Sequence, residues 1–173
     1  TWMGIDSTSY TWWDAQYDST GYTIAQITDP TSAYHILKLI RTMVDNCSQA
    51  ATKPDRIFTT NAIYNYIEDA IIAQQRYTSP AKAIIGFEGF SHKGIDIYWD
   101  PYCPAYHTFF LNSTGLGENR TLGLKGRQGA WFHLTDWKEP ANQLVRSKVL
   151  VCDCVLYCDN PRLQGAYASI AAS

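Results

Sequence analysis

The segment SHKGIDIYWDPYCPAYHTFFLN, residues 91–112, concentrates side-chain types that could do chemistry. Imidazole, carboxylate and thiol groups recur in it at His92, Asp96, Asp100, Cys103 and His107. Acid–base catalysis would require two carboxylates to converge on one substrate atom. Residues 94–100 instead alternate apolar and polar side chains, which is typical of a strand buried on one face. Asp96 and Asp100 are then about 13 Å apart, at roughly 3.3 Å per residue, so we predict a half-buried strand and no carboxylate pair.

A nucleophile is the second chemical possibility in this segment. Cys103 or Ser91, activated by His107, would form the core of a hydrolase site. Both histidines of the segment, however, stand in turn contexts, next to Lys93 and Tyr106. The sequence contains no Gly-x-Ser-x-Gly elbow, no His-Glu-x-x-His and no phosphate-loop motif. A hydrolase therefore remains an alternative hypothesis, and we assign no catalytic residue.

The cysteines raise the question of a metal site. They are Cys47, Cys103, Cys152, Cys154 and Cys158. A structural zinc site requires thiolates arranged as a tetrahedron, whereas the last three lie on one side of a strand, the nearest pair about 7 Å apart along it. That arrangement is typical of small apolar side chains that line a core. We predict five free thiols in a reducing compartment, with no bound metal and no cofactor.

Composition places the chain among globular proteins. It has 173 residues, of which 46% are hydrophobic and 17% charged, so one domain or two small lobes can bury a core. The net charge of −2, without a long run of one sign, argues against a dedicated nucleic-acid binder. No apolar run reaches the roughly 18 residues of a membrane span, and we expect no membrane partner.

The first half of the chain carries helical patterns. Helical spacing over residues 30–47, after a cap at Thr28 or Asp29, predicts one continuous helix. Its sheet-facing stripe is Ile36, Leu37, Ile40 and Val44. A second helix is predicted over residues 62–75, capped by Asn61. Its stripe consists of Ile63, Tyr66, Ile67, Ala70 and Ile71.

From residue 83 the period shortens toward two, which predicts strands. With an earlier short strand, they cover residues 56–60, 83–90, 94–100, 108–112, 129–137 and 147–158. A turn at Asn160-Pro161 precedes a closing strand, and the glycine-rich residues 113–129 indicate a surface loop. The fold class that follows is α+β, with a mainly antiparallel sheet.

Five motifs, read in order, resemble the major capsid proteins of tailed bacteriophages. MGID with TWWDAQ resembles the segment that this family places before a long helix, and KPDRIFTTNAIYNYIEDAIIAQQRY resembles a family strand and helix. GFEGFSHKGIDIYWDPYCP resembles the Gly-Phe, Lys-Gly-x-Pro-Ile and Asp stretch, although Asp96 stands where proline is common. TFFLN matches the next strand, and NPRLQGAYASI resembles the closing Asn-x-Arg-x-Gln-Gly strand. The cysteine-rich VCDCVLYC departs from the family's usual residues.

The resemblance implies the Hong-Kong-97-like capsid fold. In that fold a peripheral lobe carries a long spine helix and a long β-hairpin arm, and an axial lobe combines sheet and helices. Residues 24–47 would be the spine helix. Residues 1–53 and 146–173 would form the peripheral lobe, and residues 54–145 the axial lobe. The family's N-terminal arm and extended loop would precede residue 1, so the chain would correspond to the C-terminal two-thirds of such a protein.

The implied function is structural, and the chain is predicted not to be an enzyme. Copies would tile an icosahedral shell of hexamers and pentamers around packaged double-stranded DNA, with non-specific DNA contacts. Scaffold, portal or cement proteins are further expected partners, and the expected location is the virion, after synthesis in the host bacterial cytoplasm. The expected assembly contacts are Trp12, Trp13, Arg120, Lys125 and Arg127.

Two alternatives and one expectation about assembly accompany this interpretation. The alternatives are the hydrolase already described and a phage- or prophage-encoded α+β binding module that forms no shell. Because the resemblance begins after the arm and loop, residues 1–173 alone are expected to fold without closing into shells. Trp2, Trp12 and Trp13 are then expected to be exposed.

Overall fold

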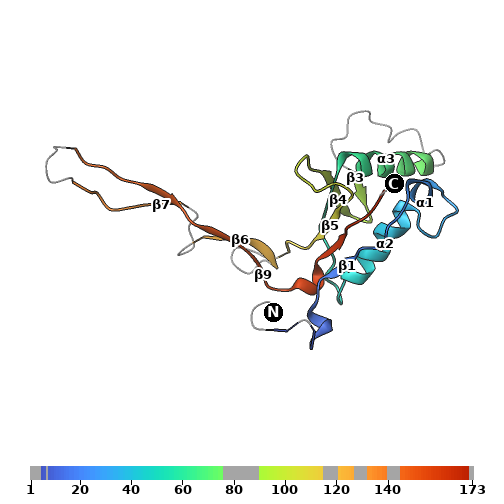
Figure 1. Cartoon of the computed structure of the whole chain (residues 1–173), viewed down its shortest axis with the longest axis horizontal. Helices are drawn as coiled ribbons and strands as arrows, with labels where there is room; N and C mark the ends of the chain where they lie inside the picture. Colours follow the sequence, from blue (N-terminus) through green and yellow to red (C-terminus); the bar gives the residue numbers. More distant parts are fainter. Residues whose placement is uncertain are drawn as a thin grey trace. The chain divides into compact units, whose positions relative to one another are not determined.

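The computed structural model describes residues 5–6, 8–75, 90–114, 121–126, 132–139 and 145–171. Its backbone divides into two compact units (Figure 1). We call Thr1–Ser113 with Asn160–Ser173 the sheet unit, and Thr114–Asp159 the hairpin unit. The hairpin unit is therefore an insertion between two segments of the sheet unit.

A six-stranded mixed sheet forms the centre of the sheet unit. Its strands stand in the order β1-β10-β5-β2-β4-β3. β1 runs parallel to β10 and β2 parallel to β4, while the other neighbours are antiparallel. The strands are β1 Gln16–Asp18, β2 Arg56–Thr59, β3 Phe90–His92, β4 Ile95–Trp99, β5 Thr108–Leu111 and β10 Gly165–Tyr167. The sheet thus joins both ends of the chain to its middle.

Three of these strands agree with the sequence pattern. β2, β4 and β5 lie within the predicted residues 56–60, 94–100 and 108–112. In β4, Ile95 and Ile97 are buried as the alternation predicts, and Trp99 at the strand end is 51% exposed. The strand predicted over residues 83–90 lies outside the described residues, apart from the first residue of β3.

A tight turn joins β3 to β4. Lys93 and Gly94 have φ angles of 53° and 74°, which suit a two-residue hairpin turn with both central residues left-handed. Gly94 adopts this backbone without steric cost, because it has no Cβ atom. His92 therefore ends β3 beside a turn, as the sequence predicts.

The continuous helix predicted over residues 30–47 is wrong in its first part. Of this range only α2 Ile36–Cys47 is an α-helix, and a non-helical segment separates it from the preceding helix α1 Ile24–Thr28. Pro30 disfavours helical backbone at the residue before it, and Asp29 has an extended ψ of 114°. The Asp29 carboxylate also accepts a hydrogen bond from the Thr31 backbone N–H at 2.8 Å. Such local bonds stabilise a turn in place of a helix, so the expected spine helix over residues 24–47 is interrupted.

The helix starts also differ from the predicted caps. α2, the helix predicted with a cap at Thr28 or Asp29, begins after His35, whose side chain makes no capping hydrogen bond. α1 is capped by Thr23, whose hydroxyl accepts a hydrogen bond from the Gln26 backbone N–H. The Gln26 side chain accepts in turn from the Thr23 N–H at 3.0 Å, which completes a capping box. The second predicted helix is α3 Asn61–Gln75. It begins at Asn61, the residue that was predicted as its cap.

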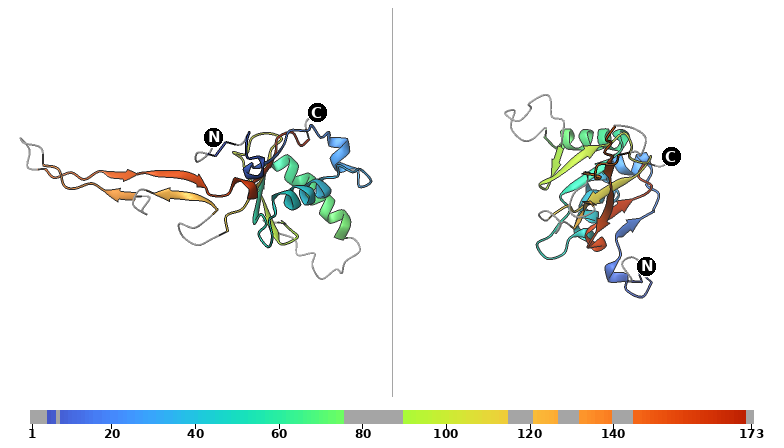
Figure 2. Two further views of the ribbon diagram at one scale, coloured as in Figure 1. Left: turned by 90° about the horizontal axis from the view of Figure 1, so that it is seen from below. Right: turned by 90° about the vertical axis from the view of Figure 1, so that its left-hand side faces the viewer.

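Helices cover one face of the sheet (Figure 2). α2 packs on β1, β5 and β10, and α3 packs on β4 and on the other two helices. The predicted stripe of α2 is confirmed, since its four residues are at most 6% exposed. Of the strands expected to face that stripe, β10 does so, whereas residues 150–158 belong to the hairpin unit. In α3, Ile63 and Ile67 are buried in the same core.

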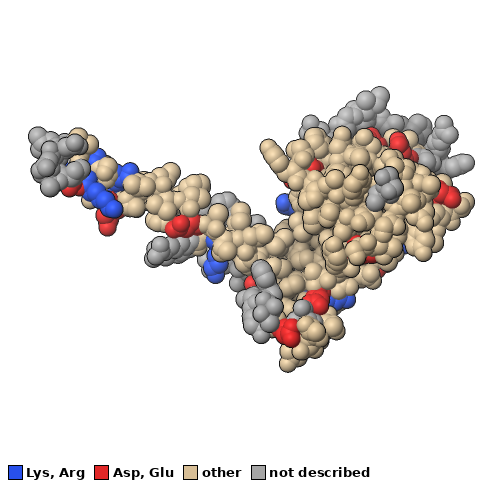
Figure 3. Space-filling view, viewed as in Figure 1, with Lys and Arg blue, Asp and Glu red and all other residues tan. Residues whose placement is uncertain are grey.

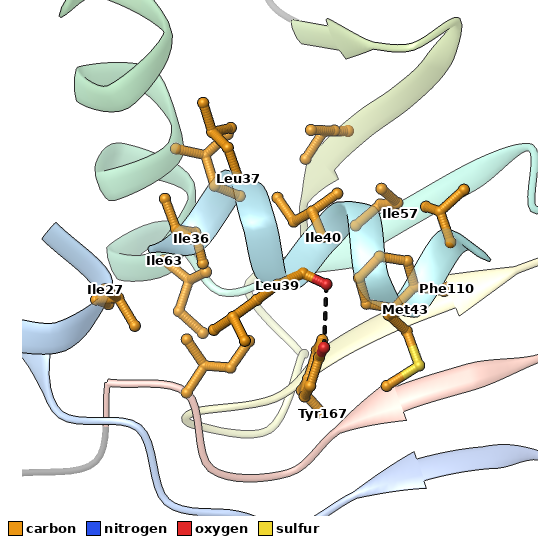
Figure 4. Close-up of a cluster of buried hydrophobic side chains, with 14 of the residues drawn as sticks. Ile27, Ile36, Leu37, Leu39, Ile40, Met43, Ile57, Ile63, Phe110 and Tyr167 are labelled. Carbon is orange, nitrogen blue, oxygen red and sulfur yellow. Dashed lines mark hydrogen bonds between the residues drawn. The ribbon is translucent and has the colours of Figure 1, made fainter. Parts of the chain in front are cut away.

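The core closes around one aromatic residue of the last strand. Tyr167 is 2% exposed, and its hydroxyl donates a hydrogen bond to the Leu39 carbonyl oxygen of α2 at 3.0 Å (Figure 4). Beside it, α2 approaches β10 so closely that a Cβ atom at Gly165 would lie 2.4 Å from Cys47 Sγ and 2.9 Å from Met43 Sδ. Glycine at this position is therefore a packing requirement.

The hairpin unit is an antiparallel ribbon of two strand segments on each side (Figure 2). The segments are β6 Leu122–Gly126, β7 Phe132–Leu134, β8 Leu150–Cys152 and β9 Cys154–Cys158. β6 pairs with β9 and β7 with β8, and a further bridge joins Lys138 to Ser147. The surface loop predicted over residues 113–129 is corrected here, because β6 lies within it. Leu122 and Leu124 already alternate with Gly123 and Lys125, which is a strand pattern.

The cysteines of this ribbon lie where the sequence places them, but not in a core. Cys152, Cys154 and Cys158 follow the alternation of one strand face, yet Cys152 and Cys154 are exposed and Cys158 is half-buried. All five cysteines are free thiols in the structure. The core-lining prediction fails because no second layer packs on this face within the described residues of the hairpin unit.

The observed units do not coincide with the predicted lobes. Residues 54–113, predicted as axial, share one sheet with residues 16–18 and 165–167, predicted as peripheral. The predicted turn at Asn160-Pro161 lies at the unit boundary, where a short 3₁₀ helix, η5 Pro161–Leu163, begins. Assignment of peripheral and axial lobes stays a prediction. Within the described part of the chain, no helix has the length and apolar character needed to cross a bilayer.

Candidate functional site

The polar residues of the segment 91–112 do not converge in the structure. Asp96 lies exposed on β4, opposite Arg56 in the parallel register of β2. Asp100 follows the strand and accepts a hydrogen bond from the Tyr102 backbone N–H at 2.8 Å, which fixes the next turn. The two carboxylates therefore play separate local roles, as the strand spacing predicts.

The Cys103 and His107 pair lacks the geometry of an activated nucleophile. The Cys103 thiol donates to the backbone carbonyl of His107 at 3.6 Å, not to its ring. His107 Nδ1 lies 2.7 Å from the Ala105 carbonyl oxygen, and the ring stacks on Phe109. Burial and the negative charge of Asp100 raise the pKa of Cys103, whereas a nucleophilic thiol requires a lowered pKa.

The serine version of the hydrolase hypothesis fails on distance. Ser91 lies on the edge strand β3, while His107 directly precedes β5. Three inter-strand spacings separate these strands in the sheet, which amounts to about 14 Å. Among the residues that the structure describes, no group of three His, Cys, Asp or Glu side chains could hold a metal ion.

The face of the sheet opposite the helices carries an aromatic row. Five residues lie side by side in the register of neighbouring strands: Tyr98 of β4, Phe58 of β2, Phe109 of β5, Ala166 of β10 and Tyr17 of β1. Phe58 and Tyr98 stack with their ring centroids 5.6 Å apart. Beside the row lies a hollow of about 330 Å³, and the side chains of Phe58, Phe109, Leu111 and Tyr102 contribute to its lining. This is an apolar contact surface rather than a substrate site.

The predicted assembly residues fall in different parts of the molecule. Trp12 and Trp13 form the short 3₁₀ helix η1 Thr11–Trp13, with their rings 5.8 Å apart. Trp12 is 64% exposed as expected, while Trp13 is half-buried. Lys125 is exposed on β6 of the hairpin unit. Trp2, Arg120 and Arg127 lie outside the described residues.

Sequence reasoning missed the exposed apolar side chains of the hairpin unit. Nine large apolar side chains there are at least 46% exposed: Leu124, Phe132, Leu134, Trp137, Val145, Val149, Leu150, Val155 and Leu156. The alternation in TLGLKG and VCDCVLYC was a usable signal for the strands. Exposure was the missing information, since a strand pattern does not say whether a second layer covers it.

On the face shown in Figure 3, acidic and basic side chains are scattered, and both signs recur along the hairpin unit. In that unit Arg146 pairs with Glu139, and Lys148 lies over the Trp137 ring. This face therefore shows no single-sign charged patch.

Comparison with known proteins gives a likeness of fold. No protein-family model and no curated protein matches the chain. A solved structure described as a cyanophage A-1(L) capsid asymmetric unit superposes with a TM-score of 0.52, at 17% sequence identity. The superposition covers 99% of this chain. The chain has a phage capsid-like fold.

This likeness confirms the coarse part of the resemblance read from the motifs. The mixed α/β architecture is that of a phage capsid chain, although the lobes of the Hong-Kong-97-like fold stay a prediction. The chain spans 55% of the length of the capsid chain that it matches. Because the identity is low, the likeness concerns the fold and not the function.

Proposed function

We propose that the chain is a structural subunit of a tailed-phage capsid, which self-assembles into an icosahedral shell around packaged double-stranded DNA. The observation that carries this proposal is the capsid-like fold over 99% of the chain. The motifs of residues 53–77, 86–104 and 160–170 support it independently, because they resemble the same class of protein in the same order.

The surface supports the proposal as well. A monomeric protein rarely exposes large contiguous apolar patches, whereas a shell subunit buries them against its neighbours. The described chain exposes the ring of Trp12, the two tyrosines of the aromatic row, Tyr17 and Tyr98, and apolar residues of the hairpin unit. The Nε1 atom of Trp13 is buried without a hydrogen-bond partner among the described residues, and a neighbouring copy could supply an acceptor.

The remaining expectations belong to this proposal. Copies associate as hexamers and pentamers, and scaffold, portal and cement proteins are additional partners. The subunit is made in the host cytoplasm and resides in the virion. The scattered charges suit weak, sequence-independent DNA contact, and Trp12, Trp13, Arg120, Lys125 and Arg127 stay proposed assembly contacts.

Antibody labelling of particles tests the function directly. An antiserum raised against residues 1–173 is applied to tailed particles purified from the source culture and viewed by electron microscopy. We expect dense, uniform labelling of broken or intact heads and an abundant matching protein in the particles. The proposal fails if the protein is confined to the soluble fraction, as a hydrolase or binding module would be.

A further inference from the structure

One face of the hairpin unit is apolar throughout its described strands. Alternate residues of a strand point to the same side, and residues paired across two strands share a side. Ten residues of the ribbon therefore lie on one face: Leu122, Leu124, Gly126, Phe132, Leu134, Leu150, Cys152, Cys154, Leu156 and Cys158. We call this set the apolar face. The opposite face carries Lys125, His133 and Asp153 together with Val151, Val155 and Tyr157. On that face His133 Nε2 lies 3.9 Å from Asp153 Oδ2. Charged and titratable polar groups of the described strands are therefore confined to the opposite face.

The large side chains of the apolar face are mostly open to solvent, whereas Leu122 and Cys158 are half-buried and Gly126 is buried. Leu156 is 62% exposed, Phe132 60% and Leu134 61%. From Cys158 to Ser147 the returning strand makes eleven residue steps, or roughly 36 Å of ribbon. A lone two-stranded hairpin is at best marginally stable in water, and an apolar face requires a second layer for stability. The ribbon thus needs a partner.

We propose that the apolar face packs against the same face of a second copy of this chain, around a two-fold axis. The proposal rests on the proposed function only for the expectation that copies associate. It goes further by assigning the surface and its symmetry. Neither motif resemblance nor the fold likeness specifies either.

The distribution of side-chain size favours a second copy as the occupant. The middle of the apolar face holds two cross-strand pairs, Gly126 with Cys154 and Phe132 with Cys152, so three of its four residues are small. Large residues flank them, Leu124 and Leu156 toward one end and Leu134 and Leu150 toward the other. A two-fold axis that runs across the ribbon between these two pairs sets Cys152 against Cys154 and Phe132 against Gly126 of the other copy, so the one large ring meets a glycine at the usual sheet separation of about 10 Å. The flanking leucines then meet large residues of the other copy.

Charge and area agree with this occupant. No charged side chain belongs to the apolar face, so a self-contact places no like charges against each other. A standard interface buries about 800 Å² from each partner. The side chains that contribute toward such an area are Leu124, Phe132, Leu134, Leu150 and Leu156, each at least 46% exposed, with the thiols of Cys152 and Cys154 between them.

Neighbouring residues on opposite faces give a matched test. Leu156 and Val155 are adjacent and almost equally exposed, at 62% and 63%, but Leu156 belongs to the apolar face. In sedimentation velocity on the full chain, Leu156→Asp is expected to weaken self-association roughly 100-fold, because it buries an unpaired charge at the contact. Val155→Asp is expected to associate like the parent. Equal effects of the two variants, or a parent that stays monomeric up to submillimolar concentration, overturn the proposal.

Thiol cross-linking tests the two-fold geometry. One variant keeps only Cys154 of the accessible thiols, with Cys103, Cys152 and Cys158 replaced by Ser. Its control carries Val155→Cys, with those three cysteines and Cys154 replaced by Ser, and both retain the fully buried Cys47. A short bifunctional maleimide is expected to give covalent dimers from Cys154 and few from the control. Equal yields indicate random collision and overturn the proposal.

The test separates this inference from the proposed function. If particles are not labelled by the antiserum but dimers form through the apolar face, the capsid role is wrong and the proposed contact is supported. If particles are labelled but no dimers form through the apolar face, the capsid role is supported and the proposed contact is wrong. If the apolar face instead packs on the sheet unit of its own chain, Leu156→Asp lowers the melting temperature at every concentration without changing association, and the proposal is wrong.

Discussion

Ile40 and Leu156 are both aliphatic residues at positions whose spacing predicts burial, yet Ile40 is fully buried and Leu156 is 62% exposed. The difference reflects the two units rather than the two residues. Every buried hydrophobic side chain that the structure describes lies in the sheet unit, where α2 and α3 cover one face of the sheet. The described residues of the hairpin unit form a ribbon without a helix or a second sheet layer. A strand pattern therefore specifies which side is apolar, while the layer that covers it must come from elsewhere.

The largest expected effect breaks the sheet unit and spares the hairpin. Ile40→Asp puts an unpaired charge into the core at a cost of several kcal/mol, which approaches the whole stability of an average domain of about 5–15 kcal/mol. We expect loss of the cooperative thermal transition, measured by circular dichroism. Leu156→Asp in dilute solution is the control and should melt like the parent. Equal losses from both would mean that the hairpin shares the core.

A smaller loss is expected from added volume in the sheet unit. Gly165→Ala forces a Cβ atom against Cys47 and Met43, and overpacking of this kind costs about 1–3 kcal/mol. Gly21→Ala is the matched control, since no atom lies within 4 Å of the added Cβ. Denaturant unfolding of both variants measures the two costs. Indistinguishable midpoints would show that α2 and β10 are farther apart than described.

Loss of one buried hydrogen bond sharpens the comparison further. Tyr167→Phe removes the donor to the Leu39 carbonyl oxygen and is expected to cost about 1–2 kcal/mol. Tyr17→Phe, on the exposed edge strand β1, should cost little, because that side chain is 66% exposed. Chemical denaturation gives both values. A cost for Tyr17→Phe equal to that for Tyr167→Phe would contradict the assignment of the core.

The last expected effect is absent at neutral pH and appears only in alkaline solution. Burial raises the pKa of the Cys47 thiol from its ordinary 9.0 to about 12. The folded chain therefore keeps a proton that the unfolded chain loses near pH 9.0, so the stabilising contribution is complete below that pH and declines as pH rises toward 12. Unfolding free energy should fall more steeply with pH in the parent than in Cys47→Ala. Parallel slopes would show that the thiol titrates normally.

Local sequence patterns predicted much of the sheet unit. The stripe of α2 from Ile36 to Val44 and the alternation of Ile95 and Ile97 depend on neighbours in sequence, so both could be read directly. The break at Asp29 was missed because Pro30 suits a first helical turn as well as it ends a preceding helix. The strand β6 was missed because its glycines resemble a loop, and its pairing with β9 joins residues distant in sequence.

The candidate site was less predictable than the fold. Sequence reasoning rightly separated Asp96 from Asp100, because strand geometry sets that distance. It could not locate the apolar face, since exposure depends on the absence of a covering layer, and it assigned the hairpin cysteines to a core. The aromatic row from Tyr98 to Tyr17 depends on the order of five strands, which no local pattern encodes.

Hydrogen exchange at two protein concentrations tests the central claim most directly. If the hairpin unit gains its second layer from another copy, amides of residues 122–126 and 154–158 exchange rapidly in dilute solution and become protected as concentration rises. Amides of β2 and β5 in the sheet unit should be protected equally at both concentrations. The account is contradicted if the hairpin amides are equally protected, or equally unprotected, at both protein concentrations.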